Sequence, residues 1–114
     1  MNKKFYRPWG YYQILHTDIS CKIKKIVIEQ NQSISYQYHL KRNENWIITE
    51  GLGTITIDDK KQKIKKGDSF YIPSGTKHMI ENNSDCVLSF IEVQTGSYFG
   101  EDDIVRISDI YGRI

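Results

Sequence analysis

Three residues in the stretch SISYQYHLKRNENWIITEG, residues 33 to 51, have side chains that bind metal ions. His39 follows Gln37 by two residues, and Glu44 follows His39 by five. An imidazole, a carboxylate and an amide oxygen are all known ligands of divalent transition metals. The same residues would also suit the polar face of an ordinary strand, so the local sequence leaves both interpretations open.

The stretch divides into two faces, because successive side chains of a β-strand point to opposite sides. The polar face consists of Ser33, Ser35, Gln37 and His39. The apolar face consists of Ile34, Tyr36, Tyr38 and Leu40. In a plain sandwich the polar face would meet water, whereas in a small barrel that holds a ligand it would line the cavity. Periodicity alone favours the sandwich without excluding the barrel.

The rest of the chain consists of short runs rich in Ile, Val, Tyr, Phe and Thr, separated by Gly, Asn, Asp, Pro or Ser. These runs predict strands at residues 11–16, 22–30, 33–40, 45–51, 53–58, 62–67, 69–73, 77–82 and 86–94. Many short strands without a long helical period indicate an all-β sandwich or barrel, here a single domain over residues 1–114. The tail from Gly100 starts with acidic residues, which suit the first turn of a short helix packed across the barrel.

The charge pattern argues against a nucleic-acid partner. The chain of 114 residues has a formal charge of +2, and its acidic and basic residues are scattered, whereas nucleic-acid binders usually cluster their basic residues. The nearest approach to a basic run surrounds the turn DDKKQ and is better interpreted as a solvated hairpin. It comprises Lys60, Lys61, Lys63, Lys65 and Lys66.

No membrane partner and no secretory signal are expected. The opening MNKKFYRPWG is positively charged but has no apolar stretch behind it, and no segment approaches the roughly 20 apolar residues of a membrane span. We therefore expect a cytoplasmic protein. Cys21 and Cys86 are far apart and lack metal-ligand spacing, so we expect them to be buried free thiols.

A second unit, GDSFYIPSGTKH at residues 67 to 78, delivers His78 at the start of a predicted strand. Gln-x-His-x₄-Glu followed by Pro-x-Gly-x-x-His resembles the two motifs of the cupin superfamily, whose members are small antiparallel jelly-roll barrels (double-stranded β-helices) with a metal at the centre. The resemblance implies one divalent ion, Zn²⁺, Mn²⁺, Fe²⁺, Co²⁺ or Ni²⁺, held by Gln37, His39, Glu44 and His78. In the alternative, a metal-free cupin, both histidines are satisfied inside the barrel.

The likeness extends beyond these motifs. The segments RPWGYYQIL, CKIKKIVIEQNQSISYQYH, NENWIITEGLGTITI, YIPSGTKHMIEN and FIEVQTGSYFGEDDIVRISDIYGR follow one another from residue 7 to residue 113. Together they resemble the type II mannose-6-phosphate isomerase domain, which often forms the C-terminal part of a bifunctional mannose-1-phosphate guanylyltransferase. No Gly-rich phosphate loop with a basic residue is present, so we expect a stand-alone isomerase domain without GTP chemistry.

The resemblance implies interconversion of mannose 6-phosphate and fructose 6-phosphate through an enediol, feeding GDP-mannose and polysaccharide synthesis. Such a reaction needs a base beside the sugar carbons and stabilisation of the developing oxyanion. Glu92 and Glu44 are the candidate bases. Glu92 shares a strand face with Phe90 and Gln94, so it points either into the barrel or, equally well, into solvent.

The phosphate of such a substrate requires cations. Arginine matches phosphate geometry with two hydrogen bonds, and the resemblance makes Arg106 the first choice, both for binding and for catalysis. Further candidates are Arg113, Lys77, Lys25 or its neighbour Lys24, and Arg7. A solvated strand-end lysine is the competing interpretation of Lys77, and a packing role competes for Arg7.

Four positions depart from the family pattern. The family usually has histidines where this chain has Leu40, Lys41 and Asn45, and an arginine where it has Met79. These departures motivate rival functions: a nucleotide-sugar ketoisomerase or epimerase, or a non-enzymatic sugar-binding cupin. A metal-dependent oxygenase is a weaker rival, because oxygenase cupins usually keep two histidines in the first motif. Since cupins commonly dimerise through edge strands, we expect a homodimer.

Overall fold

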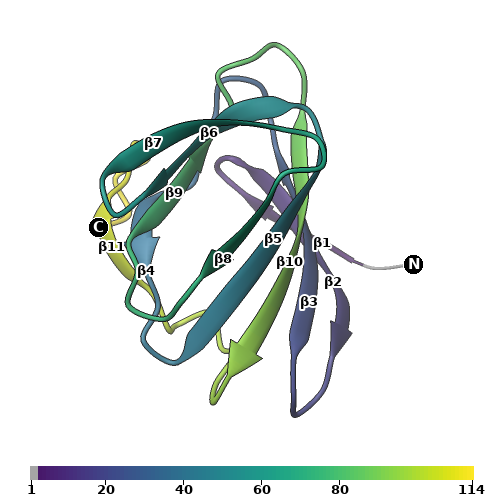
Figure 1. Ribbon diagram of the computed structural model, residues 1–114, viewed down its shortest axis with the longest axis vertical. Coiled ribbons are helices and arrows are strands. Elements are labelled where there is room, and N and C mark those ends of the chain that lie inside the picture. Colours follow the sequence, from purple (N-terminus) through teal and green to yellow (C-terminus); the bar gives the residue numbers. More distant parts are fainter. Residues whose placement is uncertain (1–2) are drawn as a thin grey trace.

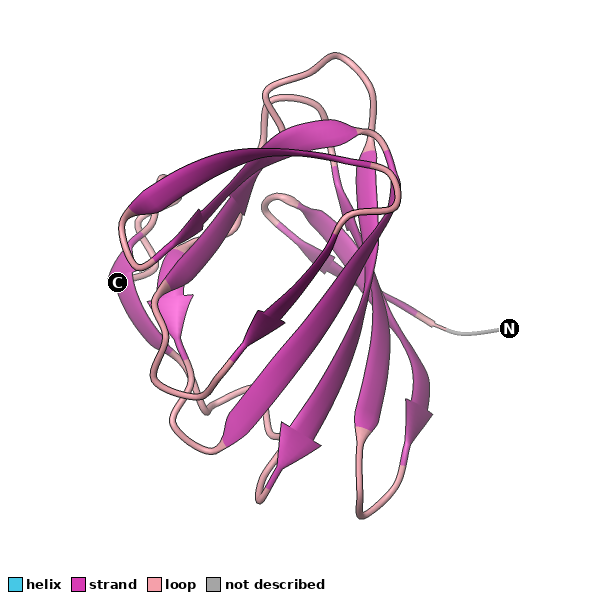
Figure 2. Ribbon diagram, in the orientation of Figure 1, coloured by secondary structure: helices cyan, strands magenta, loops and turns pink. Residues whose placement is uncertain are grey.

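Eleven β-strands form the computed structural model, which describes residues 3–114 and has no helix within them (Figures 1 and 2). The strands are β1 (Lys4–Arg7), β2 (Gly10–Thr17), β3 (Lys22–Ile28), β4 (Tyr36–Tyr38), β5 (Arg42–Glu50), β6 (Leu52–Ile57), β7 (Lys60–Lys65), β8 (Ser69–Ile72), β9 (His78–Glu81), β10 (Leu88–Gly96) and β11 (Val105–Ser108). The predicted all-β fold class is therefore confirmed.

The strands belong to two antiparallel sheets. One has six strands in the order β1-β2-β3-β10-β5-β8, and the other has five in the order β11-β4-β9-β6-β7. Figure 1 shows the strands of both sheets surrounding a common interior. Neighbours in a sheet are mostly far apart in sequence, so residues such as Gln37 and His78 become direct partners across β4 and β9.

Strand β5 shows how the sequence dictates which residues face this interior. Its side chains alternate between the two faces, with Arg42, Glu44, Trp46 and Ile48 buried. The interior face of this central strand is thus half polar and half apolar. By contrast, the lysines predicted to form a solvated hairpin lie, except for Lys66, on the edge strand β7, where only Ile64 is buried. Charged side chains on an edge discourage pairing with another chain.

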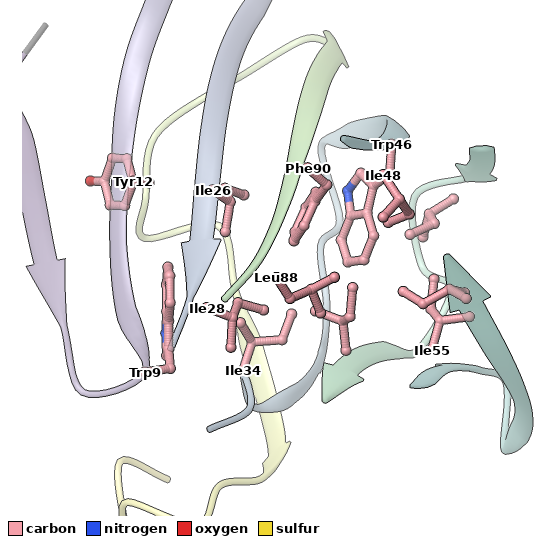
Figure 3. Packing of buried hydrophobic residues seen from close by; sticks show 13 residues of the cluster. Trp9, Tyr12, Ile26, Ile28, Ile34, Trp46, Ile48, Ile55, Leu88 and Phe90 are labelled. Atoms are coloured by element: carbon pink, nitrogen blue, oxygen red, sulfur yellow. The ribbon is translucent and has the colours of Figure 1, made fainter. Parts of the chain in front are cut away.

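The apolar core fills the interior between the two sheets (Figure 3). Its buried members are Trp9, Tyr12, Ile26, Ile28, Ile34, Trp46, Ile48, Ile55, Ile64, Ile72, Ile80, Leu88 and Phe90. The rings of Trp46 and Phe90 lie 4.4 Å apart between centroids, close enough for direct packing. The β-branched residues that predict strands also supply most of this core, so local preference and burial agree.

The tail does not form the predicted short helix. Residues Val105–Ser108 form strand β11, which pairs antiparallel with β4. The acidic residues ahead of it bond to other segments instead of capping a first helical turn: Glu101 accepts from Lys24, and Asp103 accepts from the backbone of Leu40 and Lys41. β-Branched residues downstream, such as Val105, favour an extended chain.

The predicted strand at residues 33–40 is also shorter than expected. Only Tyr36–Tyr38 is a strand, and Ser33 makes an isolated bridge to Glu81. Ile34 and Ser35 are both buried, so the strict alternation breaks there. As a result, Ile34 lines the same cavity as Gln37, although the sequence pattern assigned them to opposite faces.

Two smaller expectations concern the cysteines and the membrane. Both cysteines are free, but Cys86 is exposed and Cys21 is only partly buried, so the expectation of two buried thiols is wrong. Cys21 lies in the turn between β2 and β3, and Cys86 lies in the loop between β9 and β10, so neither belongs to the apolar core. In the part of the chain that the structure describes, no helix is long and apolar enough to cross a membrane.

Candidate functional site

A cavity of about 280 Å³ lies inside the barrel and is lined from both sheets. One part of its wall is apolar, formed by Trp9, Ile26, Ile34, Trp46 and Phe90. The rest of the wall carries cations, carboxylates and an imidazole. Burying such groups costs free energy, so their presence indicates a functional site.

Three buried side chains from different strands converge beside this cavity. Nε2 of His39 lies 3.3 Å from Oε2 of Glu44, and Nε2 of His78 lies 3.6 Å from Oε1 of the same carboxylate. All three potential ligand atoms lie within 4.8 Å of one another. His39 follows β4, Glu44 is in β5 and His78 begins β9, so the fold assembles a set that is dispersed in sequence.

Backbone carbonyls orient both imidazoles. Nδ1 of His39 lies 2.6 Å from the carbonyl oxygen of Asp103, and Nδ1 of His78 lies 2.9 Å from that of Thr76. Since a carbonyl only accepts, each Nδ1 carries the proton and each Nε2 presents its lone pair toward Glu44. Burial first, then the charges of Arg42 and His78, lower the pKa of His39 to about 4, so its ring is neutral at neutral pH.

The donor set fits a divalent metal. Nε2 of His78 is buried and has no hydrogen-bond partner among the described residues, which is the state expected of a nitrogen that binds a metal ion. Two neutral imidazoles and a carboxylate are a typical ligand set for such an ion. The structure therefore brings together three of the four predicted ligands.

Gln37, the fourth predicted ligand, lies beside His39, but its amide nitrogen rather than its oxygen faces the imidazole. Its Oε1 accepts a hydrogen bond from Ser35 Oγ at 2.6 Å, while its Nε2 lies 3.5 Å from Nε2 of His39. Rotation of the amide group would exchange the two atoms. Its role as a ligand stays a prediction.

The turn before His78 depends on a glycine. Gly75 has a φ of 81°, in the left-handed region that glycine adopts most readily. Its N–H donates to the carbonyl oxygen of His39 at 2.6 Å. The Pro-x-Gly-x-x-His unit is therefore tied directly to the first motif, which helps to hold the two imidazoles at their separation.

Arg42 was not among the predicted site residues. Its guanidinium is buried, donates from Nε to Oε2 of Glu44 at 2.8 Å, and lies with its Nη2 3.3 Å from Nε2 of His39. Trp46 donates to the other oxygen of Glu44 at 3.1 Å. Arg42 stands two residues before Glu44, so the alternation of β5 was the signal that places it on the interior face.

Glu92 points into the barrel. It lies in β10, is 4 % exposed and lines the cavity. Burial and the nearby charge of Glu44 raise its pKa, against the opposing charges of Lys24 and Arg42. Nε2 of Gln94 donates to its Oε1 at 2.5 Å. Of the two orientations that the sequence allowed, the structure has the inward one.

The predicted phosphate-binding cations fall into two groups. Arg106 and Arg113 line the cavity, whereas Lys25 and Lys77 do not. Alternation along β3 turns Lys25 to the outer face and its neighbour Lys24 inward, where Lys24 is buried. Lys77 instead forms an outside ion pair with Asp59, with 3.1 Å between Nζ and Oδ2.

The cations that line the cavity differ in whether a carboxylate pairs with them. Arg42, Lys24 and Arg113 are paired with Glu44, Glu101 and Asp109 respectively. Partial burial would raise the pKa of Glu101, but Lys24 and then Lys22 lower it to about 2. Arg7 and Arg106 have no carboxylate partner within residues 3–114, and Nε of Arg106 is buried without a hydrogen bond. These two arginines are therefore the lining cations without a carboxylate partner among the described residues.

The four departures from the family pattern lie outside the cavity. Leu40, Lys41 and Asn45 are exposed, the first two in the loop before β5 and the third on the outer face of that strand. Met79 is partly buried in β9 and lines a separate surface groove with Ser33 and Glu81. None of the four lines the cavity.

Comparison with known proteins agrees with this geometry. The chain is 43% identical over 112 residues to a mannose-1-phosphate guanylyltransferase from Salmonella montevideo, covering 98% of this chain but only 24% of that protein. The fold is that of cupins. It is similar to the cupin domain of Schizosaccharomyces pombe Cnp3, with a TM-score of 0.72 and 14% identity over 75% of this chain and 64% of that one. It also matches a Bacillus subtilis oxalate decarboxylase variant, with a TM-score of 0.80 and 18% identity over 99% of this chain and 32% of that one.

Residues 1–109 match the family described as the mannose-6-phosphate isomerase C-terminal domain. That range includes both motifs, the buried Glu92 and the cavity arginine Arg106. The chain belongs to the family of mannose-6-phosphate isomerase C-terminal domains.

Proposed function

We propose that this chain is a metal-dependent isomerase that interconverts mannose 6-phosphate and fructose 6-phosphate. The observation that carries the proposal is the position of Glu92: a buried carboxylate with a raised pKa lines the same cavity as His39 and the unpaired Arg106. An acid–base group, a metal-ligand set and a phosphate-binding cation are the three parts that aldose–ketose isomerisation of a sugar phosphate requires. The product would feed GDP-mannose and polysaccharide synthesis.

Glu92 is the better of the two predicted bases. Both oxygens of Glu44 already accept hydrogen bonds, from Arg42 and from Trp46, and the carboxylate lies between two imidazoles. Glu92 has one donor, Gln94, and faces the cavity. It would take the proton from C2 of mannose 6-phosphate and return it to C1 of the enediol, and its raised pKa makes its carboxylate a stronger base.

The remaining residues bind and orient. His39, Glu44 and His78 would hold a divalent ion, which would supply Lewis-acid stabilisation of the negative charge that develops on the sugar oxygens. Arg106, whose buried Nε has no partner, would hold the phosphate, with Arg7 as a second cation on the same cavity. General-base catalysis supplies about 10²- to 10⁴-fold, so the electrostatic contribution must supply the rest.

The rival functions lose their main support. They were motivated by the missing family histidines, and these positions lie outside the cavity. A buried carboxyl group with a raised pKa beside the cavity favours an acid–base role over sugar binding alone. The geometry therefore favours the isomerase.

The test is direct turnover. Protein loaded separately with Zn²⁺, Mn²⁺, Fe²⁺, Co²⁺ or Ni²⁺ is incubated with mannose 6-phosphate, and fructose 6-phosphate is followed by a coupled assay. We expect turnover with at least one metal, and in D₂O we expect deuterium at C2 of the recovered mannose 6-phosphate. Absence of turnover with all five metals would overturn the proposal.

We also propose that the chain forms a homodimer through an edge strand. The edges are β1 and β8 in one sheet and β11 and β7 in the other, and the lysines disfavour β7. Large apolar side chains are exposed on the other three, with Tyr6 at 70% on β1, Tyr71 at 57% on β8 and Ile107 at 42% on β11. Light scattering coupled to gel filtration gives the mass, and a monomer at every concentration would contradict the proposal.

A further inference from the structure

Residues 99–103, with the sequence FGEDD, form a strap beside the cavity. At one end Oε2 of Glu101 accepts from Nζ of Lys24 at 2.7 Å and from Nζ of Lys22 at 3.2 Å. At the other end the carboxylate of Asp103 accepts from the backbone N–H groups of Leu40 and Lys41. The strap thus connects β3 to the loop that follows β4, and Glu101 itself lines the cavity.

Lys24 is an unusual cation. Its side chain is only 5% exposed, its Nζ lies 4.1 Å from the centre of the Tyr12 ring, and it lines the cavity. A buried ammonium group is costly unless an anion pairs with it. Glu101 supplies that anion, and its depressed pKa means that the carboxylate is charged at neutral pH.

The partner of Lys24 differs from those of the other paired cavity cations. Glu44, which pairs with Arg42, is 2% exposed, and Asp109, which pairs with Arg113, is fully buried. Glu101 is 43% exposed. Within residues 3–114 it is therefore the one carboxylate of these pairs that lies partly in solvent, where it would stay hydrated on leaving its cation.

We propose that Glu101 is a placeholder anion, which holds Lys24 in the free protein and gives it up to the phosphate group of the substrate. This inference rests on the proposed function, because it adds Lys24 to Arg106 and Arg7 as a cation for the substrate's phosphate. A phosphate carries more charge and more acceptor oxygens than a carboxylate, so it competes effectively for one ammonium group. The exchange keeps Lys24 paired in both states, so no bare charge is buried when product leaves.

The test measures the binding of inorganic phosphate to metal-free protein by calorimetry at low ionic strength. The variant Glu101→Gln removes the charge but keeps an oxygen that accepts from Lys24. We expect phosphate to bind about five- to tenfold more tightly to this variant, and the gain to shrink at high salt. The matched control is Asp102→Asn, which removes a neighbouring charge whose partner is the exposed Tyr98 hydroxyl; its affinity should stay within twofold of the original.

A second variant makes the inference falsifiable on its own. Lys24→Met should weaken phosphate binding severalfold, and adding Glu101→Gln to it should give no tightening, because the two groups act through each other. An affinity that is unchanged or weaker in Glu101→Gln, or unchanged in Lys24→Met, would overturn the inference. If Glu101→Gln fails to fold in a thermal melt, Lys24→Met carries the decision.

These outcomes are separate from those of the turnover assay, since phosphate binding needs neither metal nor catalysis. The expected affinities without isomerase turnover would overturn the proposed function alone. Turnover without them would overturn only the placeholder role of Glu101.

Discussion

The interior of this barrel has an apolar end and a polar end, and the same strands build both. Along β10, the inward side chains of Leu88 and Phe90 are followed by those of Glu92 and Gln94. Along β5, Ile48 and Trp46 lie at the apolar end, and the strand begins at the polar end with Glu44 and Arg42. Antiparallel register places Phe90 opposite Ile48 and Gln94 opposite Glu44. The inward side chains of both strands therefore change from apolar to polar at the same position along the barrel.

Two other strands change in the same way. Strand β9 has His78 at the polar end and Ile80 in the core, and β3 has Lys24 at the polar end and Ile28 in the core. The apolar end stabilises the fold by burying hydrocarbon, at about 25 cal/mol per Å². The polar end buries charges, which costs stability unless each charge is paired. Buried charge at one end of an otherwise apolar interior therefore indicates a site kept for chemistry.

The largest expected effect tests the polar end. Glu92→Gln removes the proposed base while keeping its size, so kcat for isomerisation should fall by about 10²- to 10⁴-fold. Because an amide needs no charge partner, the melting temperature should be unchanged or higher. The matched control is Glu50→Gln at the exposed end of β5, which should keep full activity. Equal kcat in the two variants would rule out Glu92 as the base.

The next effect concerns the metal ligands. His39→Ala and His78→Ala should each reduce bound metal from about one equivalent to near zero, since each removes one of three protein ligands. Elemental analysis of protein dialysed against a limiting metal concentration measures it. His16→Ala tests the other group of described residues that could hold an ion, formed by His16, Asp18 and Cys21 at the surface, and it should leave the metal content unchanged. Unchanged metal content in both test variants would show that the ion, if bound, lies elsewhere.

A substitution at the apolar end should give the reverse result. Ile80 is fully buried, so Ile80→Ala should lower the free energy of unfolding by about 2–5 kcal/mol. Urea denaturation measures the loss. Metal content at saturating metal should be retained, although His78 is only two residues away. Loss of metal binding in the folded variant would show that the two ends of the barrel are not separable.

The smallest effect lies at the rim of the polar end. Hydrogen bonds from Arg113 lower the pKa of Asp109 to about 2. Because the folded pKa is below the unfolded value of about 3.9, the pair stabilises the fold above pH 4, and this contribution is lost as the pH falls from about 4 to about 2. Asp109→Asn should therefore melt about 3 °C lower than the original at pH 7 and at nearly the same temperature at pH 2. A difference independent of pH would contradict this assignment.

Much of the fold was predictable because its signals are local. Runs of β-branched and aromatic residues predicted nine of the eleven strands, with shifted boundaries. The strands β1 and β11 were missed, since each has four residues and depends on its neighbour for pairing. The acidic start of the tail suggested a helix, but Glu101 and Asp103 form contacts with segments more than 60 residues away in sequence.

The sequence predicted the metal-ligand residues of the candidate site, but not all of the cations around it. The spacing of His39 and Glu44, with the second motif at His78, predicted the ligand set. Of the cations predicted to bind phosphate, Arg106 and Arg113 line the cavity, whereas Lys25 does not, because one step along β3 separates the inward Lys24 from the outward Lys25. Lys77 was also predicted to bind the substrate, but it does not line the cavity and pairs with Asp59 on the outer surface.

By itself the sequence determined nine of the strands, the two motifs and the family, because these depend on residue types at short spacing. The tertiary structure decided that Glu92 points inward, that Arg42 lies against Glu44, and that the departures from the family face away from the cavity. The reason is physical: a side chain alternates locally between two faces, but only the packing of one sheet against the other decides which face is the interior.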